Sequence, residues 1–143
     1  MSSTTFDLYL KETAVLANQY QKRLQQVTLR LQQNHPLSDL EAAGVIHTLQ
    51  ILIENAIGKA KQLLKYYNQP IPTSAYDTMR ALVDIHQITP EQLDEWYAII
   101  GLRNRIVHEY MNLDVKRVLE VVKQEKYRLV TTFLLAPIQD VEP

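Results

Sequence analysis

Four polar residues in one short segment carry the side chains that phosphodiester chemistry needs. They are Arg103, Asn104, His108 and Tyr110. Histidine titrates near neutral pH, so it can take or give a proton. Arginine carries a planar, permanent charge whose hydrogen bonds match phosphate oxygens. The segment therefore predicts a site that binds a phosphate group and moves protons.

Helical periodicity places these residues at different positions around one helix. On a wheel with Leu93 at zero, apolar residues cover an arc from about 180° to 340°. Arg103 falls inside this arc at about 280°, and Tyr110 lies on the same face at about 260°. Asn104 and His108 are four residues apart at the edge of the arc, so their side chains can meet. A guanidinium in an apolar stripe needs a carboxylate, a partner chain or an anionic ligand.

A purely structural interpretation is also open at this point. Arg103 could pair with an acid from another helix, for instance Glu54 or Asp7, and His108 could be a polar residue at a helix end. An arginine and a histidine separated by four residues arise often by chance. The spacing alone therefore does not decide between a site and a structural ion pair.

Five helices are expected to position this segment. The first runs from about Thr5 to Gln33, with Leu8 and Val15 in its apolar stripe, and ends before Pro36. The second begins after Ser38, whose partner in a capping box is Glu41, and ends near residues 67–68.

The remaining three helices also have start signals. Thr73 or Ser74 caps the third, and Thr89 followed by Pro90 begins the fourth, which should end between residues 110 and 112. Asp114 caps a fifth helix that continues through Phe133. We expect an all-α protein, an antiparallel four-helix-type bundle with an added short helix. It should form a single domain over residues 1–143, with a flexible tail from about residue 137.

Composition narrows the classes of function. The chain has 143 residues, a formal net charge of -1 and no cysteine. Proteins that coat long nucleic acids by charge alone are usually strongly basic, so a small, focused RNA site fits better. No secretory signal and no membrane-spanning apolar run is recognisable, which predicts a soluble protein in a reducing cytoplasm.

The segment from Gly101 to Tyr110 resembles the signature of HEPN domains, in which an arginine and a polar residue precede a histidine after a short spacer. The tyrosine two residues after the histidine resembles the HepT branch of that family. The resemblance implies a metal-independent endoribonuclease toxin without a cofactor. It also implies a homodimer in which two signature helices face each other across a cleft, with Arg103 at the junction.

The resemblance gives each residue an expected role. Arg103 would bind the phosphate, Asn104 would orient His108 or the phosphate, and two His108 side chains would transfer the protons of RNA cleavage. The partners it implies are an RNA substrate (tRNA or mRNA) and a minimal nucleotidyltransferase antitoxin. Tyr110 would bind RNA or accept AMP from that antitoxin.

Two other interpretations remain open from the sequence. The chain could be a non-catalytic HEPN-like module that docks a nucleotidyltransferase or a nucleotide, or a plain helical scaffold, which leaves Arg103 unexplained. Basic residues of the second and fifth helices could hold phosphates, although a solvated helix face is the more ordinary explanation of each run. They are Lys59, Lys61 and Lys65 in the second helix, and Lys116, Arg117, Lys123, Lys126 and Arg128 in the fifth.

Overall fold

The computed structural model describes residues 3–137, with side chains from Thr5 onward. Within this range the chain is all-helical, which confirms the predicted fold class. The flexibility expected of the tail falls on residues 138–143, which lie outside the described residues. The elements are α1 (Ser3–Gln32), α2 (Asp39–Tyr66), α3 (Ala75–Asp84), the 3₁₀ turn η1 (Pro90–Gln92), α4 (Leu93–His108), the 3₁₀ turn η2 (Tyr110–Asn112), α5 (Val115–Lys123) and α6 (Arg128–Leu135).

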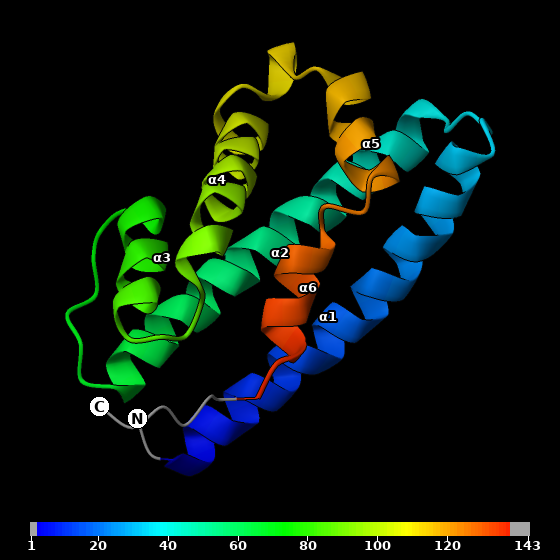
Figure 1. Cartoon of the computed structure of the whole chain (residues 1–143). Helices are drawn as coiled ribbons and strands as arrows, with labels where there is room; N and C mark the ends of the chain where they lie inside the picture. The colour runs from blue at the N-terminus through cyan, green and yellow to red at the C-terminus, as the bar shows by residue number, and fades with distance from the viewer. Residues whose placement is uncertain (1–2, 138–143) are drawn as a thin grey trace.

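The long helix α2 forms the centre of the molecule. It lies antiparallel to α1, with α6 alongside both helices and the pair α3 and α4 on its other side (Figure 1). The shorter α5 packs near the start of α2 and against α1. None of the helices in residues 3–137 is long and apolar enough to cross a membrane. Because α2 is covered by other helices on several sides, most of its apolar side chains are buried.

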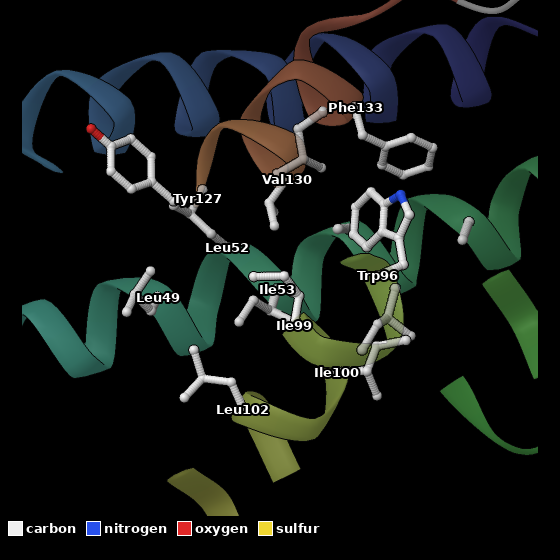
Figure 2. Close-up of a cluster of buried hydrophobic side chains, with 14 of the residues drawn as sticks. Leu49, Leu52, Ile53, Trp96, Ile99, Ile100, Leu102, Tyr127, Val130 and Phe133 are labelled. Carbon is white, nitrogen blue, oxygen red and sulfur yellow. The ribbon is translucent and has the colours of Figure 1, made fainter. Parts of the chain in front are cut away.

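The core is formed where α2, α4 and α6 meet. Figure 2 shows the Trp96 ring of α4 facing the Phe133 ring of α6, with centroids 5.3 Å apart in an edge-on arrangement. Such edge-to-face pairs add to the burial of both rings. Because this cluster holds one face of α4 in the core, it also fixes which side chains of α4 point toward the surface. The other labelled residues are Leu49, Leu52, Ile53, Ile99, Ile100, Leu102, Tyr127 and Val130.

The helix starts agree with the sequence signals. The Ser38 hydroxyl accepts from the backbone of Glu41, and the Glu41 carboxylate accepts from the backbone of Ser38. The Ser74 hydroxyl accepts from the backbone of Asp77 at the start of α3, and the Asp114 carboxylate accepts from the backbone of Arg117 at the start of α5. These side chains satisfy backbone N–H groups that have no partner within the helix. The predicted capping residues therefore position both neighbours of the signature segment.

The predicted fifth helix is two helices. α5 ends at Lys123 and α6 begins at Arg128, because Glu125 adopts a left-handed backbone conformation with φ of 59°. The buried Tyr127 follows the turn, and its hydroxyl lies 3.0 Å from the Thr28 hydroxyl of α1. No glycine or proline marks this turn in the sequence, so local pattern gave no sign of it.

The buried face of α1 also differs from the prediction. Leu8 and Val15 are more than half exposed, whereas the face that packs inward includes alanine and threonine beside two large apolar residues. Small side chains let a helix approach its neighbours closely, so they can form a core face without being strongly hydrophobic. The inward face comprises Phe6, Thr13, Ala17, Leu24 and Thr28.

Candidate active site on α4

Helix α4 has a buried face and a face that carries the signature residues. Its core face holds Trp96, Ile99, Ile100, Leu102 and Ile106, all buried. Because this face is fixed against α2 and α6, the side chains between its apolar positions are held in constant directions. The helix is thus a rigid support for the residues that follow.

Arg103 is half-buried on α4, as its place on the wheel predicts. Its Nε atom is out of contact with solvent and has no hydrogen-bond partner. Three buried side-chain atoms in the described residues lack a hydrogen-bond partner. Nε of Arg103 belongs to a charged group, whereas the other two atoms belong to neutral side chains. Neither Glu54 nor Asp7 forms an ion pair with it in the described part of the chain. The ion pair that the structural alternative expects is therefore not formed among the described residues.

Asn104 contacts a residue that the sequence did not predict. Its Nδ2 donates a long hydrogen bond of 3.4 Å to the Tyr76 hydroxyl at the start of α3. Among the described residues no hydrogen bond joins Asn104 to His108, although the two lie one turn apart. Tyr76 was missed because α3 is distant in sequence, and only the packing of α3 against α4 brings it here.

His108 and Tyr110 are both exposed at the end of α4. His108 is the last residue of the α-helix, one turn after Asn104. Tyr110 is 60% exposed and begins the turn η2. The expectation that Tyr110 shares the buried face of α4 with Arg103 is wrong, because the backbone leaves the α conformation at Glu109.

A groove of about 950 Å³ lies between α4 and the α5–α6 segment. Arg105 and Glu109 line it from α4, and Arg117 and Arg128 line it from α5 and α6. None of the four predicted site residues lines it. The candidate site is therefore separate from this groove, on a different part of the surface of α4.

Lys59 is a second cation among apolar residues, and it has the partners that Arg103 lacks. It is 2% exposed, so the prediction of a solvated face is wrong at this position. Its Nζ donates to the carbonyl oxygens of Phe133 at 2.6 Å and Ala136 at 2.8 Å. Burial lowers the pKa of Lys59 to about 8. These contacts join α2 to the end of α6, which makes Lys59 a structural residue.

The fold is similar to solved toxin–antitoxin structures. One is a toxin–antitoxin complex with AMP-PNP, with a TM-score of 0.72, 24% identity, and coverage of 94% of this chain and 99% of that one. Another is a tri-AMPylated Shewanella oneidensis HEPN toxin in complex with an MNT antitoxin. Its TM-score is also 0.72, with 24% identity and coverage of 94% and 98%. At these identities the likeness shows the fold.

Sequence comparison shows the family of the chain as well as its fold. The chain is 32% identical over 105 residues to the mRNA nuclease HepT of Shewanella oneidensis strain MR-1, which is 71% of this chain and 76% of that protein. The family model described as "Ribonuclease HepT-like" matches residues 17–134, a range that includes all four signature residues. The chain therefore belongs to the HepT-like ribonuclease family, as its segment from Arg103 to Tyr110 predicts.

Proposed function

We propose that this chain is the toxin of a toxin–antitoxin pair and cleaves RNA without a metal ion. The observation that carries the proposal is the half-buried Arg103 guanidinium, whose Nε has no partner on the helix that also bears His108. An anionic ligand supplies the missing partner, and the phosphodiester of RNA is such a ligand. Membership of the HepT-like family supports the same assignment.

The proposed reaction uses the nucleophile that RNA carries. One His108 takes the proton of the 2′-hydroxyl, and the 2′-oxygen attacks phosphorus. The bond from phosphorus to the 5′-oxygen breaks, and a second protonated histidine gives that oxygen a proton. Arg103 stabilises the negative charge on the phosphate oxygens. The products are a 2′,3′-cyclic phosphate and a free 5′-hydroxyl, so no metal-bound water is required.

A homodimer supplies the second histidine in this proposal. His108 of a second subunit would serve as the acid if the two α4 helices face each other across a two-fold axis. The exposure of His108 and Val107, which is 41% exposed, supports an additional contact at the end of α4. Light scattering should give twice the mass of one chain at micromolar concentration, and a monomer would contradict this arrangement.

The antitoxin in the proposed pair is a nucleotidyltransferase that modifies Tyr110. The Tyr110 oxygen attacks the α-phosphorus of ATP, the phenolic proton leaves, and pyrophosphate is released. At 60% exposure, Tyr110 is the most accessible tyrosine of the chain. The solved HEPN toxin described as tri-AMPylated supports this form of control. AMP at Tyr110 would place a bulky anion near His108 and exclude RNA.

The central test is the substitution His108→Ala. Loss of a proton-transfer group should slow cleavage of purified RNA by about 10²- to 10⁴-fold. Because His108 is exposed, the circular dichroism spectrum and the melting temperature should be retained. EDTA should leave cleavage by the wild type intact. Full activity of the variant would disprove the assignment and favour a module that only docks a nucleotidyltransferase.

A second test concerns the modification. The chain is incubated with ATP and the nucleotidyltransferase, and intact mass, peptide mapping and RNA cleavage are measured together. Mass increases in AMP units should be lost in Tyr110→Phe and retained in Tyr66→Phe, a tyrosine that is 45% exposed at the end of α2. Mapping of AMP to a different residue would move the acceptor away from Tyr110.

A further inference from the structure

We infer that Tyr76 and Tyr97 form a platform on which an unpaired RNA base stacks beside the cleavage site. This inference rests on the proposed function and names two residues that the signature does not contain. The two rings lie edge to face, with centroids 5.4 Å apart and an angle of 78° between their planes. Tyr76 comes from α3 and Tyr97 from α4, so the pair spans the junction of these helices.

The platform lies on the same face of α4 as Asn104 and His108. Tyr97, Gly101, Asn104 and His108 follow one another at intervals of four, three and four residues, which is the spacing of one helix face. Asn104 donates to the Tyr76 hydroxyl, and His108 follows it by one turn, a rise of about 6 Å. A base on Tyr76 is therefore a neighbour of the nucleotide whose 2′-hydroxyl gives its proton to His108.

A cation lies close to Tyr76 on α4. A Cβ atom at Gly101 would stand 3.6 Å from the Tyr76 hydroxyl and 3.7 Å from Nη1 of Arg105. The Tyr76 phenol and the Arg105 guanidinium therefore both lie next to Gly101. An aromatic ring next to an arginine suits a nucleotide, since the ring stacks on the base and the cation binds a phosphate.

Exposure distinguishes Tyr76 from the aromatic residues of the core. Tyr76 is 37% exposed, whereas Trp96, on the buried face of α4, is 1% exposed. An accessible ring can take a base on its face, and base stacking tolerates any sequence. A base must be unpaired to stack in this way, so the platform favours single-stranded RNA over a duplex.

The test measures stacking separately from cleavage. Binding is followed by fluorescence anisotropy in the His108→Ala protein, with a labelled single-stranded oligoribonucleotide that the wild type cleaves at one place. Tyr76→Leu should weaken binding by about 5- to 100-fold, whereas Tyr76→Phe should stay within about 2-fold of the parent. Leucine keeps an apolar side chain without a ring, and phenylalanine keeps the ring without the hydroxyl.

Abasic nucleotides then locate the stacked base. An abasic nucleotide next to the cleavage site should weaken RNA binding to the His108→Ala parent, which keeps Tyr76. It should have little further effect on RNA binding to the Tyr76→Leu variant. The control is Tyr66→Leu, because Tyr66 lies at the end of α2, is 45% exposed and packs edge to face against its neighbour Tyr67. This control should bind RNA like the parent.

The outcomes separate this inference from the proposed function. Suppose that the wild type cleaves RNA through His108, but that every abasic nucleotide weakens binding by the same factor in the parent and in Tyr76→Leu. The two changes then act independently, and no base stacks on Tyr76. Equal losses in Tyr76→Phe and Tyr76→Leu would also overturn stacking, because they would point to the hydroxyl. If RNA is not cleaved, or His108→Ala cleaves it equally well, the proposed function fails and the platform fails with it.

Discussion

Two cations lie among apolar residues in this chain, and they differ in what satisfies them. Lys59 on α2 is almost fully buried, and its Nζ has two carbonyl partners at the end of α6. Arg103 on α4 is half-buried, and its Nε has none. Buried polar groups in native proteins are nearly always paired, so each exception requires an explanation.

We propose that this difference separates Lys59, which stabilises the fold, from Arg103, which binds a ligand. The partners of Lys59 come from the same chain and join two helices that are far apart in sequence. In our proposal the partner of Arg103 comes from outside the chain, as an anion or a second subunit. Substitutions at the two positions should therefore have opposite effects on stability and on activity.

The largest expected effect is on cleavage by Arg103→Met. Removal of one group that stabilises transition-state charge typically costs about 10²- to 10³-fold in rate. Methionine fills a similar space without a buried N–H group, so the free energy of unfolding should be unchanged or higher. Cleavage of purified RNA and urea unfolding measure the two quantities. A control is Arg23→Met, an exposed arginine on α1, which should cleave like the wild type. A clear loss of stability in Arg103→Met would show that Arg103 has a structural role.

The substitution Lys59→Met should have the opposite outcome. It removes the donor to two carbonyl groups, and an unpaired buried polar group costs about 1–3 kcal/mol. Urea unfolding at pH 7 should show this loss, while cleavage by the folded fraction should be unaffected. Lys65→Met changes an exposed lysine on the same helix and should leave stability nearly unchanged. Reduced cleavage at full stability would place Lys59 in the active machinery.

The lowered pKa of Lys59 should make the free energy of unfolding depend on pH. Burial lowers the pKa of folded Lys59 to about 8, below its usual value of 10.5. Between these values the unfolded chain binds more protons, so the contribution of Lys59 to stability increases as pH rises from about 8 to 10.5. The wild type should gain about 1–2 kcal/mol relative to Lys59→Met between pH 8 and pH 10. A difference that stays constant over this range would mean that the folded pKa is not lowered.

The sequence predicted what depends on local pattern. Ser38, Thr89 and Asp114 mark helix starts because capping is a contact between residues three apart. The signature residues were found for a related reason, since all four lie within one helix and the turn after it. Arg103 could be singled out because its charge conflicts with the apolar stripe around it.

The sequence did not predict what depends on contacts between distant segments. Tyr76 meets Asn104 across 28 residues, and Lys59 meets Phe133 across 74. The turn before Tyr127 has no glycine or proline, and the hydroxyl of Thr28 on α1 contacts Tyr127 there. Packing decides each of these features, so helical periodicity cannot reveal them.

The smallest expected effect compares the glycines next to the two cations. Gly101, two residues before Arg103, has room for a Cβ at ordinary contact distances of 3.6 and 3.7 Å. Gly101→Ala should therefore raise the free energy of unfolding by about 0.5–1 kcal/mol, because alanine is the better helix former.

Gly58 precedes Lys59, and a Cβ there would stand 2.9 Å from the Tyr9 hydroxyl. Gly58→Ala should gain less or lose stability, since the half-buried Tyr9 must shift. The double variant Gly58→Ala/Tyr9→Phe removes the hydroxyl and should recover the gain relative to Tyr9→Phe alone. Equal gains at both glycines would show that the region around Lys59 is no more tightly packed than the region around Arg103.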